Sequence, residues 1–175
     1  MERFQAYVDA NRTRFVDELK EFCAQPSIAA QGIGLEETAR WVEDRLERLG
    51  ARVHRFVMDG SPPILCAELG EGEQTLLIYN HYDVQPPEPL EEWHSPPFEP
   101  TIRDGRLYAR GVSDNKGDLL CRLQALEAYQ ATIGPLPVHV RFIIEGEEEI
   151  GSPHLILFAQ QHRDLLQADG CLWES

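Results

Sequence analysis

The chain has no uncharged apolar run that approaches the ~18 residues of a membrane-spanning helix. Residues 1–25 carry charges throughout and lack the apolar segment and small-residue cleavage site of a secretory signal peptide. Neither a membrane-embedded nor a secreted protein fits this pattern. We therefore expect a soluble, cytoplasmic protein without a membrane partner.

Positive charge is also scarce. Lysine and arginine number 16 against 30 aspartates and glutamates, which gives a formal net charge of −14, and no basic cluster occurs along the chain. Proteins that bind nucleic acid carry a basic patch that meets the phosphates. The composition therefore argues against nucleic acid as a partner.

Cysteines are few and far apart. The four of them, Cys23, Cys66, Cys121 and Cys171, form no C-x-x-C pair. This spacing argues against a zinc finger and against a disulfide framework, so we expect four buried, reduced thiols. The chain also lacks internal repeats, and its 175 residues are typical of one domain.

Apolar side chains recur at helical spacing in two segments near the start of the chain. These are Phe15, Leu19 and Phe22, followed by Val42, Leu46 and Leu49. Gly50 directly after the second segment is a typical helix stop. Two amphipathic helices are therefore predicted.

Short segments rich in branched and aromatic residues predict strands, and two further helices are expected near 115–130 and 153–161. Asp104-Gly105 predicts a hairpin turn within 101–108. Residues 76–79 are continuously apolar, as in a strand at the centre of a sheet. The predicted strands are 53–58, 64–69, 75–79, 138–144 and 170–173.

Helices and strands alternate, so the predicted fold class is α/β, a three-layer sandwich whose mostly parallel central sheet is covered by helices on both faces. In such folds ligands gather at the carboxyl ends of the strands. Four side chains that can bind a metal follow predicted strands: His81, Glu148, Glu149 and Glu174.

His81 and Asp83 form a pair that suits a metal site. Asp83 can accept a hydrogen bond from one ring nitrogen of His81 and so orient the other nitrogen towards a metal. A histidine satisfied by a nearby turn is the structural alternative. Both interpretations stay open on the pair alone.

The acidic positions carry alternatives of their own. Asp114 precedes a predicted helix, so it is either a helix N-cap or a ligand. The run Glu147-Glu148-Glu149 is either a solvated turn or a confined group of carboxylates that a cation compensates. The apolar strand before the run and the sharp turn after it favour the second interpretation, with one carboxylate binding metal and its neighbour accepting a proton from water.

Three motifs together resemble the M20 family of dinuclear metallopeptidases and deacylases, which includes carboxypeptidases, carnosinase-like dipeptidases, acetylornithine deacetylases and succinyl-diaminopimelate desuccinylases. They are 81–86 (HYDVQP), 110–117 (RGVSDNKG) and 145–152 (EGEEEIGS). Their occurrence in this order is highly specific, and the similarity spans nearly the whole chain.

The resemblance implies a role for each candidate residue. Asp114 bridges two metal ions, His81 and Glu174 complete the site of one ion, and Glu149 holds the other. Glu148 is the general base.

The resemblance also assigns Asp83 as the residue that orients His81, and it predicts a cis peptide bond between Asp114 and Asn115. Asp169 is the fallback for Glu174, which only Trp173 and Ser175 frame.

The implied reaction is the hydrolysis of an amide bond in a short peptide by two divalent ions, with zinc expected first and manganese or cobalt as alternatives. The stretch from HYDVQP to residues 92–98 (EWHSPPF) resembles dipeptidases more than deacetylases. Deacylation of N-acyl amino acids is the alternative within the family.

Members of the family are generally longer than this chain. We therefore expect 1–175 to be the N-terminal portion of a catalytic domain, without the lid or dimerisation domain and without the return segment that supplies the last metal-binding histidine. The longer enzyme is expected to be a homo-oligomer. A catalytically silent metal-binding or interaction domain is the alternative to an active hydrolase.

Overall fold

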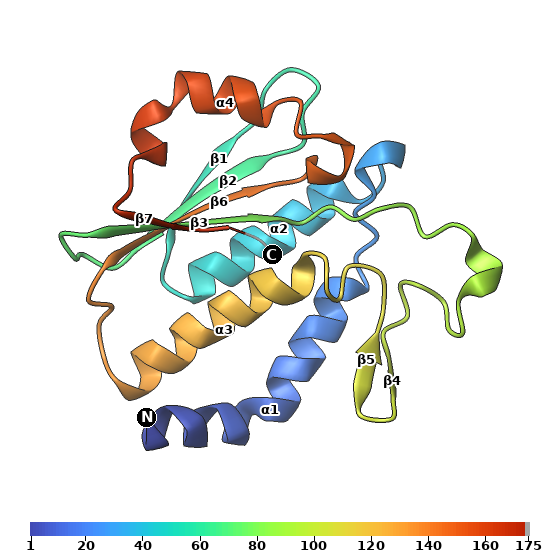
Figure 1. Ribbon diagram of the computed structural model, residues 1–175, viewed down its shortest axis with the longest axis horizontal. Coiled ribbons are helices and arrows are strands. Elements are labelled where there is room, and N and C mark those ends of the chain that lie inside the picture. Colours follow the sequence, from blue (N-terminus) through green and yellow to red (C-terminus); the bar gives the residue numbers. More distant parts are fainter. Residues whose placement is uncertain (174–175) are drawn as a thin grey trace.

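The computed structural model describes residues 1–173 of the chain, and a five-stranded sheet runs through its middle (Figure 1). The strands lie in the order β1-β2-β6-β3-β7. Their bounds are Arg52–Phe56 for β1, Ile64–Leu69 for β2, Thr75–His81 for β3, His139–Glu145 for β6 and Gly170–Leu172 for β7.

Strand direction in this sheet is mostly parallel, as predicted. β3 pairs in parallel with β6 on one side and with β7 on the other. β2 runs antiparallel to both of its neighbours, β1 and β6, so it is the one strand of the sheet that points the other way. The carboxyl ends of β3 and β6 therefore lie side by side, with His81 opposite Glu145.

Helices cover both faces of the sheet (Figure 1), which confirms the three-layer prediction. The helices labelled α1, α2 and α3 lie below the sheet in this view, and α4 lies above it. Their bounds are Glu2–Cys23 for α1, Leu35–Arg48 for α2, Lys116–Thr132 for α3 and Leu155–Gln161 for α4. Short 3₁₀ helices span Ala29–Gln31, Leu90–Glu92, Glu148–Ile150 and Arg163–Leu166.

Each face of the sheet has its own apolar core, and β2 contributes to both. Leu65 points into the larger core with α1, α2 and α3. Cys66 points into the smaller core, where Phe158 of α4 is buried. Because adjacent residues of a strand face opposite sides, a strand covered on both faces must be apolar throughout. The continuous apolar segments of the sequence have this origin.

The predicted hairpin forms a separate two-stranded sheet of β4 (Thr101–Arg103) and β5 (Arg106–Tyr108). Asp104 and Gly105 at its turn have φ of 50° and 73°. Two positive φ angles are what a type I′ turn requires, and Asp-Gly adopts them readily.

Some expectations about the elements were wrong. Cys23 and Cys66 are buried thiols as expected, but Cys121 and Cys171 are exposed. Cys171 lies on β7, whose three residues are all exposed at the edge of the sheet. The ends of some elements also differ from the predicted ones: β1 ends at Phe56, β3 continues through His81 and α4 begins at Leu155.

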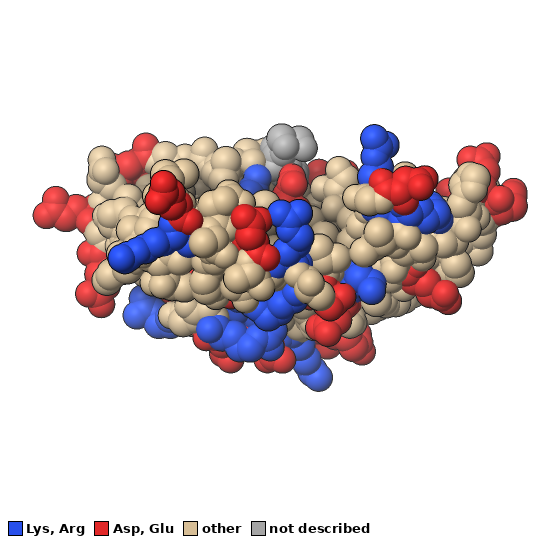
Figure 2. All heavy atoms as spheres, turned by 90° about the horizontal axis from the view of Figure 1, so that it is seen from below, with Lys and Arg blue, Asp and Glu red and all other residues tan. Residues whose placement is uncertain are grey.

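No helix among residues 1–173 is long and apolar enough to cross a membrane. On the face of the molecule seen in Figure 2, basic and acidic side chains lie next to one another. Exposed ion pairs on α1 also join neighbouring charges of opposite sign, Arg12 with Asp9 and Lys20 with Asp17.

Phe142 of β6 is fully buried in the larger core, between the sheet and α1, α2 and α3. Its replacement by alanine is expected to lower the free energy of unfolding by about 3–5 kcal/mol, because the lost apolar contacts leave a cavity. Chemical denaturation measures this loss. Ile156→Ala, at a side chain that is 62% exposed, is the control and should cost less than about 0.5 kcal/mol. Equal losses for the two variants would contradict the packing described here.

Candidate metal centre

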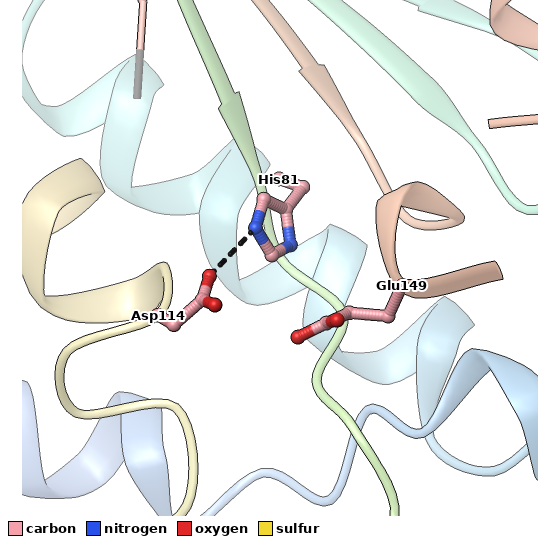
Figure 3. Close-up of side chains that lie close together, drawn as sticks. All are labelled: His81, Asp114 and Glu149. Carbon is pink, nitrogen blue, oxygen red and sulfur yellow. Dashed lines mark hydrogen bonds and ion pairs between the residues drawn. The ribbon is translucent and has the colours of Figure 1, made fainter. Parts of the chain in front are cut away.

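Three side chains from separate parts of the chain meet at the carboxyl end of the sheet. His81 ends β3, Asp114 precedes α3 and Glu149 lies in the 3₁₀ turn after β6 (Figure 3). One ligand atom from each residue lies within 4.8 Å of the others. The structure thus brings together three of the four predicted metal ligands.

The surroundings of His81 decide which ring nitrogen carries the proton. Nδ1 lies 3.1 Å from the main-chain oxygen of Asp83 and 3.2 Å from its Oδ1. Both oxygens can only accept, so Nδ1 must donate. Nε2 then presents its lone pair towards Asp114 Oδ1 at 3.1 Å and Glu148 Oε2 at 3.8 Å. A lone pair that faces two carboxylates requires a proton or a cation between them, which is the environment of a metal ligand.

Asp83 also holds the acidic turn in place. Its Oδ1 accepts a hydrogen bond from the Glu148 amide at 3.2 Å, and its Oδ2 accepts one from the Glu149 amide at 3.1 Å. The carboxylate is fully buried. A buried carboxylate needs such donors, and here they belong to the residues that complete the site.

Asp114 is 73% exposed at its side chain and does not cap α3, so the N-cap interpretation was wrong. The N-cap position belongs to Asn115, and the Asp114–Asn115 peptide bond is cis, as predicted. The side-chain oxygen of Asn115 accepts hydrogen bonds from Asn80 Nδ2 and from the His81 amide. The bend before α3 is thereby tied to the end of β3.

Lys116 also holds the bend before α3 in place. Its ammonium group is buried and donates to the main-chain oxygens of Phe22 and Gln25 at the end of α1. Burial lowers the pKa of Lys116 to about 7. The start of α3, and with it Asp114, is thus fixed to α1 as well as to the sheet.

Glu149 is partly buried and is held at its carboxylate by Gln85. Gln85 Nε2 donates to Glu149 Oε2 at 2.6 Å and to the main-chain oxygen of Glu149 at 3.2 Å. Desolvation raises the pKa of Glu149, an effect that the hydrogen bond from Gln85 opposes and the negative charge of Asp114 adds to. We predicted no role for Gln85 from the sequence, although it belongs to the HYDVQP motif.

The remaining glutamates of the motif are also engaged, so the solvated-turn interpretation does not hold. Glu147 is buried, and its Oε2 lies 2.8 Å from Nδ1 of His154. Glu145 is buried and accepts hydrogen bonds from the hydroxyls of Tyr79 and Ser152. Burial raises the pKa of Glu145. Glu148 and Glu149 are left as the two that approach His81.

The fourth predicted ligand, Glu174, lies outside the described residues. Its fallback, Asp169, was wrong. The Asp169 carboxylate accepts a hydrogen bond from the Thr75 amide at the start of β3, whereas His81 ends that strand. Seven residues of extended chain separate the two places by about 20 Å.

Arg122 of α3 secures the last described residue beside the site. Its guanidinium donates to the main-chain oxygens of Tyr79 and Trp173, both at 2.8 Å. The rings of Tyr79 and Trp173 stack with their centroids 4.1 Å apart. The end of β7 is therefore held against the end of β3.

These features define the class of protein: an α/β domain with a candidate metal centre of one imidazole and several carboxylates at the carboxyl ends of its parallel strands. Residues 77–174 match the model of Peptidase family M20/M25/M40. The chain belongs to this family, which confirms the resemblance of its motifs.

Known proteins with similar sequences are longer than this chain. It is 38% identical to the Beta-Ala-His dipeptidase of Homo sapiens over 94% of its length, but it spans only 36% of that protein. It is 31% identical to the Cys-Gly metallodipeptidase dug1 of Schizosaccharomyces pombe, with 97% of the chain and 39% of that protein covered.

Solved structures show the same relation. The crystal structure of human carnosine dipeptidase 1 matches with a TM-score of 0.92 at 34% identity, over 99% of this chain and 41% of that one. The M20 family metallo-carboxypeptidase Sso-CP2 of Sulfolobus solfataricus matches with a TM-score of 0.87 at 42% identity, over 92% and 37%.

Asp83→Asn tests how the acidic turn is held. The new amide group turns a donor towards one of the two main-chain N–H groups, so the amide of either Glu148 or Glu149 should exchange with deuterium roughly tenfold faster, which corresponds to one lost hydrogen bond. Hydrogen exchange followed by NMR measures this. Asp17→Asn, at an exposed position on α1, is the control and should leave both rates unchanged. Unchanged rates in Asp83→Asn would show that its carboxylate does not hold the turn.

Proposed function

We propose that the protein is a metal-dependent dipeptidase. The observation that carries the proposal is the convergence of His81, Asp114 and Glu149, with ligand atoms within 4.8 Å of one another, in a chain of the M20 family. Relatives that match nearly all of the chain are named as dipeptidases for Beta-Ala-His and Cys-Gly. Because the chain spans less than half of those relatives, the activity is proposed for the full-length gene product.

Two divalent ions are the proposed cofactors. Asp114 would lie between them, His81 and Glu174 would hold one ion, and Glu149 the other. The exposed side chain of Asp114 and the Nε2 lone pair of His81 support this arrangement. Zinc suits mixed imidazole and carboxylate ligands, and manganese or cobalt are the alternatives.

When bound, two divalent ions polarise a scissile carbonyl and lower the pKa of water. The chain's own residues supply the proton transfer. Glu148 is 35% exposed at its side chain, so water can reach its carboxylate, while Asp83 holds its main-chain amide. In this proposal Glu148 accepts a proton from the attacking water and passes it to the leaving nitrogen.

Short peptides are the proposed substrates, and deacylation of N-acyl amino acids is the second candidate. The second candidate rests on the succinyl-diaminopimelate desuccinylase of Methylobacillus flagellatus, which is 34% identical over 78% of this chain. The Beta-Ala-His and Cys-Gly dipeptidases named above match 94% and 97% of the chain. This wider coverage favours dipeptides.

Metal analysis and hydrolysis assays on the purified full-length gene product test the function. We expect bound divalent metal, hydrolysis of β-Ala-His or Cys-Gly, and loss of turnover after chelation that zinc or manganese restores. Turnover of N-succinyl or N-acetyl amino acids but not of dipeptides would favour the deacylase. Bound metal without turnover of either class would favour a silent metal-binding domain.

Glu148→Gln is expected to lower kcat by about 10²–10⁴-fold, because the amide cannot accept the proton. Metal content should stay nearly unchanged, since Glu148 is not a proposed ligand. Steady-state kinetics and elemental analysis on the same preparation measure both. Glu71→Gln, at an exposed loop residue between β2 and β3, is the matched control and should keep full activity. Wild-type kcat in Glu148→Gln would remove Glu148 from this role.

A further inference from the structure

Gln85 contacts Glu149 in an unusual way for an exposed side chain. A single nitrogen, Nε2, donates both to the main-chain oxygen and to the carboxylate Oε2 of Glu149. The side chain therefore folds back towards the centre, although residue 85 is exposed. A donor that connects the main chain and the side chain of the same residue restricts the rotamers of that residue.

The loop around Gln85 is fixed on both sides. The Val84 amide donates to the main-chain oxygen of Ser27 at 2.8 Å, and the Val84 side chain is fully buried. On the other side, Arg110 Nη2 donates to the main-chain oxygen of Pro86 at 3.2 Å. An anchored loop presents the amide of Gln85 at a defined position, so its contact with Glu149 costs little further ordering.

The same loop holds Glu149 at two levels. The Asp83 carboxylate accepts a hydrogen bond from the main-chain amide of Glu149 at 3.1 Å, and Gln85 Nε2 donates one to the Glu149 carboxylate at 2.6 Å. Asp83 thereby places the main chain of Glu149, whereas Gln85 places its charged end. The carboxylate of Glu149 points into the space shared with His81 and Asp114 (Figure 3).

We propose that Gln85 is a positioning residue that sets the direction of the Glu149 carboxylate and thereby the affinity for the metal ion that Glu149 holds. The proposal rests on the metal centre proposed above. Gln85 itself does not bind the ion. Hydrogen-bond partners of a metal-binding carboxylate typically change metal affinity by about 10–100-fold.

Gln85→Met tests this in the full-length gene product, because methionine keeps the length of the side chain but removes the donor. Calorimetric titration of zinc into metal-free protein should show one binding step weakened about 10–100-fold and the other unchanged. Excess zinc should restore kcat with an unchanged KM for the dipeptide. Gln160→Met, at an exposed glutamine of α4, is the matched control and should bind as the wild type does.

The background variant Glu149→Ala separates this mechanism from a general effect on folding. Gln85→Met should not weaken zinc binding further when Glu149 is already absent. Additive losses in the double variant, unchanged affinity in the single variant, or a raised KM at wild-type affinity would each overturn the proposal, and the last result would make Gln85 a substrate contact.

A measurement without metal distinguishes failure of this proposal from failure of the proposed function. Three-bond NMR couplings in the metal-free protein should report one χ1 rotamer for Glu149 in the wild type and averaged rotamers in Gln85→Met. Averaged couplings in the wild type would overturn the role of Gln85. A wild-type protein that binds no zinc but keeps a single rotamer would refute the metal centre, while the contact that positions Glu149 would stand.

Discussion

The carboxylate of Asp83 is the interaction on which the site depends. It is fully buried, and its two oxygens face three groups at once: Nδ1 of His81 and the amides of Glu148 and Glu149. A buried charge without such partners would be very costly. The cost is avoided only when the end of β3 and the turn after β6 adopt this arrangement, so the energetics of one side chain fix the geometry of three others.

The rest of the fold places that carboxylate and brings the third part of the site to it. Parallel pairing of β3 with β6 puts His81 opposite Glu145, so that the next residues of both strands leave the sheet together. The bend before α3 comes from another layer. Lys116 ties it to α1, and Asn115 ties it to Asn80 and to the main-chain amide of His81 on β3. The position of Asp114 is thus fixed by the contacts of the two residues that follow it.

Much of this could be predicted from the sequence, because the signals were local. Periodic apolar residues located the helices, and continuous apolar segments located the central strands. The three motifs located His81, Asp114 and Glu149. The missed features depend on tertiary contacts. Nothing in the sequence near Gln85 shows that Glu149, far along the chain, accepts its hydrogen bonds.

Other errors have the same physical origin. Whether Cys171 is buried depends on what lies beside β7, which occupies an edge of the sheet among the described residues. Asp169 precedes β7 and contacts the start of β3, whereas His81 ends that strand, so Asp169 lies at the wrong end of the sheet although its residue type suits a metal ligand. Position along a strand, rather than residue type, decides which carboxylate can approach the centre.

The electrostatics of the site link its fold to its chemistry. Asp83, Asp114, Glu148 and Glu149 crowd around one imidazole in a chain of net charge −14. Asp83 is compensated by its donors, but Asp114 and Glu149 repel each other across the space into which Nε2 points. A divalent cation there would convert this repulsion into attraction and stabilise the folded state, since the unfolded chain offers no such cluster. The electrostatic repulsion between the carboxylates of Asp114 and Glu149 is thus the feature that would give the centre its affinity for metal.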